Sequence, residues 1–259
     1  MQLTFIGTCA HDYSPLLKTI YKDQLDKDAR RSSSLLINRH VLIDCGDHVP
    51  ESLQIQGIPF ADVDILLLTH LHGDHYCPAN IRTLADGAAR KLQVFAHRSA
   101  LNRLKKDLEG ANVEIRALSY CKVRKLSGGL TVTALPANHT CCPSHYLIED
   151  GEKSVYYATD GAWIMYDAFY YLRKKKLDVC ILDATVGDYE GDFRVAEHNS
   201  IPMIRLMLQS LYQASVCDDH TRILLSHIAP SLHESHESTR LRLAEEKMEP
   251  AYDGMEIIL

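Results

Sequence analysis

The segment His70-Leu71-His72-Gly73-Asp74-His75 directly follows an apolar run from Val63 to Leu68. The run predicts a buried strand, and the glycine that follows it predicts a tight loop at the end of that strand. Three imidazoles and one carboxylate fall within six positions of this loop. Neutral imidazole and carboxylate form a donor set suited to zinc, manganese or iron, whereas a surface loop that is His-rich by chance is the alternative. The segment therefore predicts a divalent metal site at the end of a strand in an α/β fold.

Three further candidate ligands follow later apolar runs. His139 comes after the strand expected at 130–135, Asp160 after the strand at 154–158, and His227 after the strand at 221–225. Taken singly, each is an ordinary polar loop residue. Their shared position just past a strand indicates loops that converge at one edge of a sheet.

The whole chain alternates between short apolar runs and amphipathic stretches. The periodicity predicts strands at 2–6, 33–37, 40–44, 63–68, 92–96, 113–117, 130–135, 145–149, 154–158, 178–183, 221–225 and 255–258. It predicts helices near 49–56, 78–90, 98–109, 163–175, 199–215 and 235–248. We find no repeat and no linker, so we expect one domain over residues 1–259.

The pattern His-x-His-x-Asp-His resembles the metal-binding signature of the metallo-β-lactamase superfamily. The resemblance implies an α/β fold, the four-layer αββα sandwich of that superfamily, and a hydrolase with a dinuclear centre. It implies that a first metal is held by His70, His72 and His139, that a second is held by Asp74, His75 and His227, and that Asp160 bridges the two. The cofactors implied are two divalent ions, either Zn²⁺ or Mn²⁺, with iron as a further candidate.

Within that superfamily the chain is most similar to the PhnP-type phosphodiesterases of the bacterial carbon–phosphorus lyase pathway. The shared segments are Leu42-Ile43-Asp44, Leu135-Pro136-Ala137-Asn138-His139, Glu197-His198-Asn199, Ser226-His227-Ile228 and the C-terminal Tyr252-Asp253-Gly254-Met255-Glu256-Ile257. The resemblance implies a phosphodiesterase that acts on small or cyclic phosphodiesters through a hydroxide bridging the metals. Asp74 would orient that hydroxide and His198 would protonate the leaving group.

Several alternatives stay open at this point. A lactone or thiolester hydrolase would use the same metals without needing His198, and a non-catalytic metal-dependent binding protein is a third reading. His198 can instead flank the helix expected at 199–215. Asp44 can support the His loop by accepting hydrogen bonds, or it can be an ordinary strand-end residue beside Cys45 and Gly46.

The short spacing of 21 residues between His139 and Asp160 bears on the partner. The transfer-RNA 3′-processing branch of the superfamily usually carries an extended arm between these two ligands, and there is no room for one here. The net charge of −6 also argues against a dedicated nucleic-acid binder. We therefore expect a small phosphodiester substrate and no folded transfer RNA, with a homodimer left open.

Composition sets the remaining expectations. With 46% hydrophobic and 24% charged residues, the chain has the make-up of a globular protein. It shows no apolar stretch near the ~18–20 residues of a membrane span and no secretory leader, so we expect no membrane contact and a cytoplasmic location. Eight cysteines without a Cys-x-x-Cys pair argue against a disulfide framework.

Other stretches receive no definite role. Residues 8–32 predict a long loop or a short helix near the metal edge, and the basic run at 173–176 fits a helix C-terminus better than a phosphate site. The residues left without a role are His11, Cys141, Cys142, His145, His233 and His236.

Overall fold

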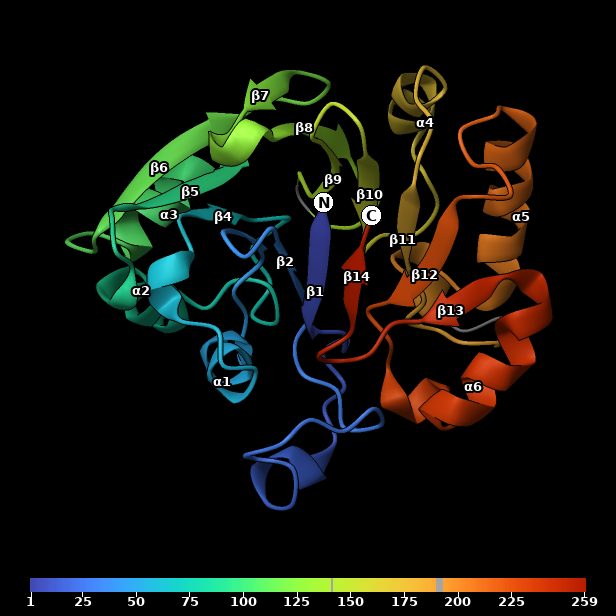
Figure 1. Cartoon of the computed structure of the whole chain (residues 1–259), viewed down its shortest axis with the longest axis horizontal. Helices are drawn as coiled ribbons and strands as arrows, with labels where there is room; N and C mark the ends of the chain where they lie inside the picture. Colours follow the sequence, from blue (N-terminus) through green and yellow to red (C-terminus); the bar gives the residue numbers. More distant parts are fainter. Residues whose placement is uncertain (141, 190–192) are drawn as a thin grey trace. The chain divides into compact units, whose positions relative to one another are not determined.

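The computed structural model describes residues 1–140, 142–189 and 193–259 (Figure 1). The chain divides into two compact units, one of Met1–Ser119 with Tyr252–Leu259 and the other of Tyr120–Ala251. Each unit is built around its own seven-stranded mixed sheet with helices against it. The α/β prediction is confirmed by these sheets and helices, whereas the single domain over residues 1–259 stays a prediction.

The sheet of the first unit has the strand order β14-β1-β2-β3-β4-β5-β6. These strands are β1 (Gln2–Gly7), β2 (Ser34–Ile37), β3 (Val41–Ile43), β4 (Ile65–Leu67), β5 (Leu92–His97), β6 (Val113–Leu118) and β14 (Glu256–Ile258). The pairs from β14 to β3 are antiparallel, and those from β3 to β6 are parallel. Strands β3 and β4 are short apolar runs without a polar residue, as expected for strands buried on both faces.

Three helices pack on this sheet: α1 (Val49–Ile55), α2 (Pro78–Gly87) and α3 (Leu101–Asp107). Leu53, Leu84 and Leu104 project from these helices into one fully buried cluster that includes Leu66 of β4. Full burial of a leucine side chain is worth about 1.5–3 kcal/mol, so this cluster fixes the frame from which the His loop after β4 extends.

The sheet of the second unit has the strand order β13-β12-β11-β10-β9-β8-β7. Its strands are β7 (Val123–Lys125), β8 (Thr131–Pro136), β9 (Ser144–Glu149), β10 (Ser154–Ala158), β11 (Val179–Asp183), β12 (Arg222–Ser226) and β13 (Met248–Pro250). Strands β10 to β13 are parallel, so their carboxyl ends share one edge of the sheet. That edge is where functional loops gather in mixed sheets of this kind.

The helices of the second unit are α4 (Tyr166–Leu172), α5 (Ile201–Gln213) and α6 (His236–Leu243). The Ser200 hydroxyl caps α5 by accepting a bond from the amide of Met203 at 3.4 Å. Leu211 of α5, Leu172 of α4 and Leu243 of α6 are fully buried in one cluster with Leu182 and Leu225 of the sheet. The chain also makes short 3₁₀ turns at Pro15–Lys18, Phe60–Asp62, Arg98–Ala100, Ser127–Gly129, Phe193–Ala196, Pro230–Leu232 and Ala244–Glu246.

The periodicity did not predict two of the strands, and the predicted helices are longer than the observed ones, most of all at 163–175 and 235–248. Strand β7 is exposed at all three positions, so it has no apolar signature. Strand β13 contains Pro250, which is tolerated because β13 lies at the edge of its sheet. The helix expected at 235–248 ends at Leu243, since Lys247 turns left-handed with φ 55° and Met248 enters β13.

Among the described residues, no helix combines the length and the hydropathy that crossing a membrane requires.

Candidate metal centre

The first ligand cluster lies in the first unit, on the loop that follows β4. The rings of His70 and His72 have centroids 4.6 Å apart, and those of His70 and His75 are 4.4 Å apart. His75 Nε2 lies 3.2 Å from Asp74 Oδ2. His70, Asp74 and His75 are buried, while His72 is exposed. The structure therefore brings together the four residues that the sequence motif predicted for this loop.

Asp44, at the end of the neighbouring strand β3, stabilises this loop through hydrogen bonds. Its carboxylate accepts bonds from the amide of Thr69 at 2.7 Å, from the Thr69 hydroxyl at 2.8 Å and from His75 Nδ1 at 2.7 Å. The Thr69 oxygen in turn lies 3.1 Å from His70 Nδ1. Because the Thr69 hydrogen goes to Asp44, His70 Nδ1 is the donor to Thr69. The interpretation of Asp44 as a supporting carboxylate thus agrees with its contacts.

Gly46 allows the turn after β3 to approach the same loop. A Cβ at this position would lie 1.8 Å from the carbonyl oxygen of Asp74, which no side chain can tolerate. The amide of Cys45 also donates to the carbonyl of His75 at 2.8 Å. The His loop is therefore held by backbone contacts as well as by Asp44.

The second ligand cluster lies in the second unit, at the carboxyl ends of its parallel strands. Asp160 follows β10, and its two oxygens lie 3.3 Å from His139 Nε2 and 3.7 Å from His227 Nε2. His139 follows β8 and His227 follows β12, and all three side chains are nearly inaccessible to solvent. The structure therefore groups the three predicted ligands of this unit around Asp160.

Asp183, the last residue of β11, orients this second cluster, and the sequence analysis did not assign it a role. Its carboxylate lies 3.1 Å from His227 Nδ1 and 3.3 Å from His198 Nδ1. It also accepts bonds from the amides of Asp160 at 3.1 Å and Asn199 at 2.8 Å. A signal was present, because Ile181-Leu182-Asp183 repeats the apolar-apolar-Asp ending of Leu42-Ile43-Asp44.

Thr185 completes the support of His227. Its hydroxyl oxygen lies 2.8 Å from His227 Nδ1 and 3.0 Å from Asp183 Oδ2. The Thr185 hydroxyl therefore contacts His227 and Asp183 in the same way as the Thr69 hydroxyl contacts His70 and Asp44. In both units a strand-end carboxylate and a threonine hydroxyl fix the imidazoles together.

His198 lies inside the second cluster rather than at its margin. Its Nδ1 is 3.2 Å from Asp160 Oδ1, as well as 3.3 Å from Asp183 Oδ2, and its ring stacks on that of His227 at 5.5 Å. Ligand atoms of Asp160, Asp183, His198 and His227 all lie within 4.8 Å of one another. The structure thus places His198 among the predicted ligands of this unit and gives it two carboxylate neighbours, Asp160 and Asp183.

The charges in this cluster reinforce one another. Burial alone would raise the pKa of the Asp183 carboxyl, but the hydrogen bonds from His198 and His227 hold that pKa well below its usual range. Burial lowers the pKa of the His198 imidazole, and the bond to Asp183 and the charge of Asp160 outweigh burial, so this pKa is raised. Asp183 is therefore an ionised acceptor for two imidazoles.

Three of these strand-end residues have left-handed backbones. The φ angles are 62° at Asp44, 59° at Asp160 and 55° at His227. Such values are uncommon outside glycine and concentrate at functional sites, where the surrounding structure compensates for the strain. Here the turn directs each side chain toward its cluster immediately after the strand ends.

The donor atoms fit divalent metal ions. His70, His75 and His227 each use Nδ1 for a threonine or aspartate oxygen, and His139 Nδ1 lies 3.4 Å from the carbonyl of Glu197. In a neutral ring that donates from Nδ1, the lone pair stands on Nε2, which is the form that binds a metal. The clusters together offer imidazole nitrogens and carboxylate oxygens, the donors preferred by zinc, manganese and iron.

The unassigned residues have differing surroundings. His11 Nδ1 lies 4.0 Å from Asp74 Oδ1, and His145 Nδ1 bonds the Tyr156 hydroxyl at 2.9 Å. His236 is buried in the first turn of α6, and Cys142 is partly buried. His233 Nε2 donates to the carbonyl of Ala184 at 2.6 Å. Cys141 lies outside the described residues. The loop at 8–32 contains one short 3₁₀ turn, Pro15–Lys18.

The chain belongs to the metallo-β-lactamase superfamily. A family model described as a β-lactamase superfamily domain matches residues 39–228, a stretch that includes every predicted ligand. The family and the donor set together imply divalent metal ions. The superfamily predicted from the His motif is confirmed by this match.

Individual proteins extend the comparison. A ribonuclease Z of Haloarcula marismortui is 27% identical over 166 residues, which cover 59% of this chain and 49% of that protein. The structure of a diphosphatase from the PhnP family superposes with a TM-score of 0.76 at 21% identity, covering 99% of this chain and 96% of that one. The short form of human tRNase Z gives 0.71 at 17% identity over 100% and 99% of the two chains. These structures confirm the metallo-β-lactamase sandwich fold that the resemblance implied. The chain spans only 15% to 49% of the length of the ribonucleases Z that it matches.

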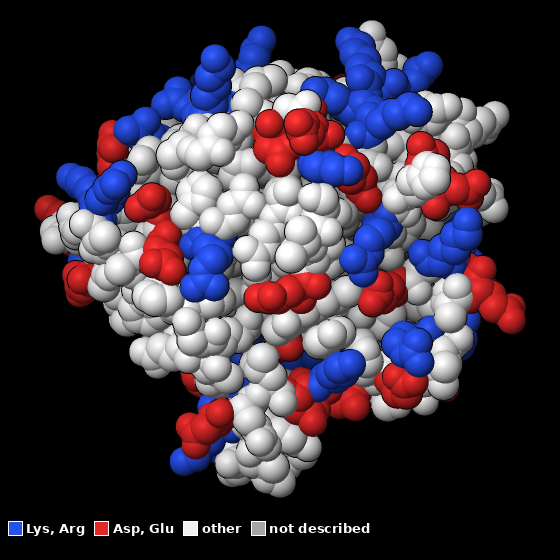
Figure 2. Space-filling view, in the orientation of Figure 1, with Lys and Arg blue, Asp and Glu red and all other residues white. Residues whose placement is uncertain are grey.

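The expected exclusion of folded transfer RNA is wrong. Curated relatives are ribonucleases Z, and a tRNase Z shares the fold over the whole chain, so the length of the His139–Asp160 segment alone does not exclude a transfer RNA partner. The charge argument fails because a net charge averages over the surface. Figure 2 shows Lys and Arg side chains in groups along the upper edge of the face in view, whereas lower on the same face they alternate with acidic side chains. A transfer RNA partner is therefore compatible with the chain.

Proposed function

We propose that the protein is a dinuclear metal-dependent phosphodiesterase. In this proposal one divalent ion is held by His70, His72 and His139, a second by Asp74, His75 and His227, and Asp160 is shared. The observation that carries it is the pair of supporting carboxylates, Asp44 and Asp183, each bonded to Nδ1 of a candidate ligand at 2.7 and 3.1 Å. Carboxylate–imidazole–metal arrangements of this kind are typical of catalytic metal sites.

The chemistry divides between the ions and the chain's own residues. Bound divalent ions supply Lewis acidity toward a phosphoryl oxygen and lower the pKa of water toward neutrality. Asp74 has two carboxylate oxygens, so one can orient the attacking water while the other serves as a ligand. His198 donates through Nδ1 to Asp183, which leaves Nε2 to carry a proton to the leaving oxygen.

The presence of His198 is the reason to propose phosphodiesters rather than other esters as substrates. An alkoxide leaving from phosphorus needs a proton, and a histidine held by a buried carboxylate is suited to deliver it. The relatives point the same way, because their names include ribonuclease Z and a PhnP-family diphosphatase. The proposal also includes the identity of the native metal, which is zinc, manganese or iron.

The test is a substrate panel with the protein reconstituted separately with Zn²⁺, Mn²⁺ or Fe²⁺. The panel contains bis-p-nitrophenyl phosphate, a nucleoside 2′,3′-cyclic phosphate, a 3′-extended precursor transfer RNA, a lactone and a thiolester. We expect metal-dependent turnover of phosphodiesters above that of the carbon esters. Faster turnover of the lactone or the thiolester would overturn the phosphodiesterase assignment, and metal binding without any turnover would indicate a binding protein.

A matched pair of variants separates this site from a contaminating activity. Asp160→Ala removes the shared ligand and should abolish the turnover. Asp23→Ala changes an acidic side chain that is 83% exposed, and it should leave the turnover unchanged.

A further inference from the structure

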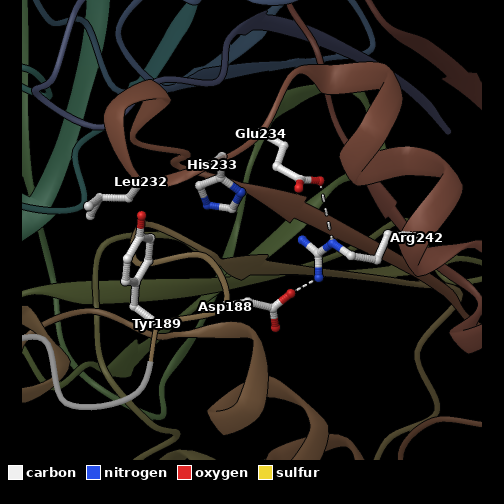
Figure 3. Close-up of a pocket in the computed structure, with 6 residues that line it drawn as sticks. All are labelled: Asp188, Tyr189, Leu232, His233, Glu234 and Arg242. Carbon is white, nitrogen blue, oxygen red and sulfur yellow. Dashed lines mark ion pairs between the residues drawn. The ribbon is translucent and has the colours of Figure 1, made fainter.

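A cavity of about 330 Å³ opens in the second unit (Figure 3). Its lining comes from three segments: the loop after β11, the turn after β12 and helix α6. The lining residues are Asp188, Tyr189, Leu232, His233, Glu234 and Arg242. The volume lies at the lower end of the roughly 300–1,000 Å³ typical of small-molecule sites.

The cavity has an apolar side and a polar side. Figure 3 shows Tyr189 and Leu232 together on one side and Asp188, Glu234 and Arg242 on the other. His233 lies between them, and its ring is fixed because Nε2 donates to the carbonyl of Ala184 at 2.6 Å. A ligand for this cavity therefore needs an apolar surface and a hydrogen-bonding edge.

The polar side is organised before any ligand arrives. Arg242 pairs with Asp188, and Asp188 also lies 3.3 Å from Arg205 Nη1. Arg205 forms a fork with Glu246 at 2.6 and 2.8 Å. At the other end, Arg242 Nε is 3.9 Å from Glu234, whose side chain is 66% exposed. Donors and acceptors thus alternate along one connected chain of side chains.

The charge of this chain argues against a phosphate ligand. Three carboxylates and two guanidinium groups leave one net negative charge, which repels an anion. A sugar fits poorly as well, because its hydroxyl groups surround the whole ring. A nucleobase has two apolar faces for Tyr189 and Leu232, and one edge on which hydrogen-bond donors and acceptors alternate.

The loop that forms the cavity is the one that orients the second ligand cluster. Asp183 bonds His227 and His198, Ala184 bonds His233, and Asp188 bonds Arg242. Gly187 brings this loop against the turn after β12, since its φ is +65° and a Cβ there would lie 2.2 Å from the carbonyl of Leu232. A group seated in the cavity is therefore positioned by the same short segment as His198.

We propose that this cavity binds the nucleobase of a nucleotide substrate, with stacking on Tyr189 and hydrogen bonds from Arg242 and to Glu234. The assignment of the base to a substrate rests on the proposed phosphodiesterase function. The binding of the base itself does not, because it needs neither a metal nor catalysis.

The first experiment measures binding of adenosine and ribose by calorimetry in the presence of a chelator. We expect adenosine to bind and ribose not to bind. Tyr189→Ala and Arg242→Gln should each weaken adenosine binding by about 5- to 100-fold, the usual worth of one stacked base or one bidentate contact. Tyr189→Phe keeps the ring, and Arg222→Gln changes the exposed pair of Arg222 with Glu249 elsewhere in the unit, so both should bind as the wild type does. Equal binding of ribose, or unchanged binding in both cavity variants, would overturn the proposal.

The second experiment separates this inference from the proposed function. Hydrolysis of adenosine 2′,3′-cyclic phosphate and of bis-p-nitrophenyl phosphate is compared in the same variants with metal added. The KM for the cyclic nucleotide should rise in Tyr189→Ala and Arg242→Gln, while kcat/KM for the base-free diester stays unchanged. If both diesters are cleaved with unaltered KM in every variant, the cavity proposal fails and the proposed function stands. If adenosine binds as expected and no diester is cleaved, the proposed function fails and the nucleobase site stands.

Discussion

The carboxylate of Asp183 lies 3.1 Å from Nδ1 of His227, so the last residue of one strand orients a candidate metal ligand that follows the neighbouring strand. Strands β11 and β12 are parallel neighbours in register at Asp183 and Ser226, so the residue after Ser226 turns back over Asp183. Asp44 and His75 repeat the arrangement in the first unit at 2.7 Å. A buried acceptor therefore fixes a candidate ligand in each unit.

Loss of the Asp183 charge should weaken metal binding. Asp183→Asn keeps the shape of the side chain but lets His227 and His198 reorient, and we expect zinc affinity to fall by roughly 10- to 100-fold. The measurement is competition with a chromophoric chelator. Asp178→Asn is the matched control, because Asp178 precedes the same strand at its opposite end and bonds Ser154 and Lys153. Equal zinc affinity in wild type and Asp183→Asn would contradict the orienting role.

Asp160 is predicted to be shared by two ions. Its oxygens approach both His139 and His227, which the proposal assigns to different metals. Elemental analysis of Asp160→Ala should therefore show loss of both ions rather than one. A variant that still holds two ions at wild-type affinity would falsify the bridging assignment.

Variants of Gly46 and Gly73 test whether the turn after β3 must contain a glycine to approach the backbone of the His loop. Gly46→Ala places a Cβ against the carbonyl of Asp74, so we expect a lower thermal midpoint and reduced metal content. Gly73→Ala should be tolerated, since a Cβ there meets no atom within 4 Å. Thermal unfolding of both variants with and without zinc checks this, and similar losses in the two variants would contradict it.

Asp253 predicts a pH dependence of stability in the first unit. Burial raises the pKa of this carboxyl to about 6, even though it accepts bonds from the amide of Arg31 at 2.7 Å and the Thr8 hydroxyl at 2.8 Å. The unfolded carboxyl has a pKa of about 3.9, so the folded state binds the proton more tightly. Its stabilising contribution is complete below about pH 4 and is lost as the pH rises through about 6.

Asp253→Asn should remove this dependence. The free energy of unfolding of the wild type should fall relative to that of Asp253→Asn between about pH 4 and pH 6, by up to about 3 kcal/mol. Urea unfolding at several pH values measures the difference, with the exposed Asp23→Asn as control. If the wild type gains stability relative to Asp253→Asn over this range, the charge of the neighbouring Arg30 outweighs burial.

The site residues that could be predicted from the sequence are those that a short local pattern marks. The His loop needs only the apolar run of β4 and six consecutive residues, and the single ligands His139, Asp160 and His227 stand directly after apolar runs. Asp183 was not recognised as functional although it ends an apolar run as Asp44 does, because that ending alone does not reveal its contact with a histidine fifteen positions away. The proposed nucleobase cavity is lined by three segments that are separated in the chain, so no local sequence pattern predicts it.

Edge strands show the same limit for the fold. Strand β7 pairs with β8 although all three of its side chains are exposed, so only the pairing reveals it. Buried strands such as β10 are predicted with their exact bounds, because burial on both faces demands a continuous apolar run. The partner was misjudged for a related reason: total charge does not tell where Lys and Arg gather.

His198 is predicted to act on the leaving group. Its Nδ1 faces Asp183 and Asp160 at 3.3 and 3.2 Å, and seven other residues account for the proposed ligands, so its Nε2 can carry a proton. His198→Ala should keep two ions per chain and lose roughly 10²–10⁴-fold in turnover of diesters with alkyl leaving groups, the usual worth of general acid catalysis. The loss should be smaller for nitrophenyl esters, because nitrophenolate departs without protonation. Elemental analysis and a comparison of the two substrate types measure both effects. Loss of an ion would make His198 a ligand, and equal losses on both substrates would mean that it positions the phosphate instead.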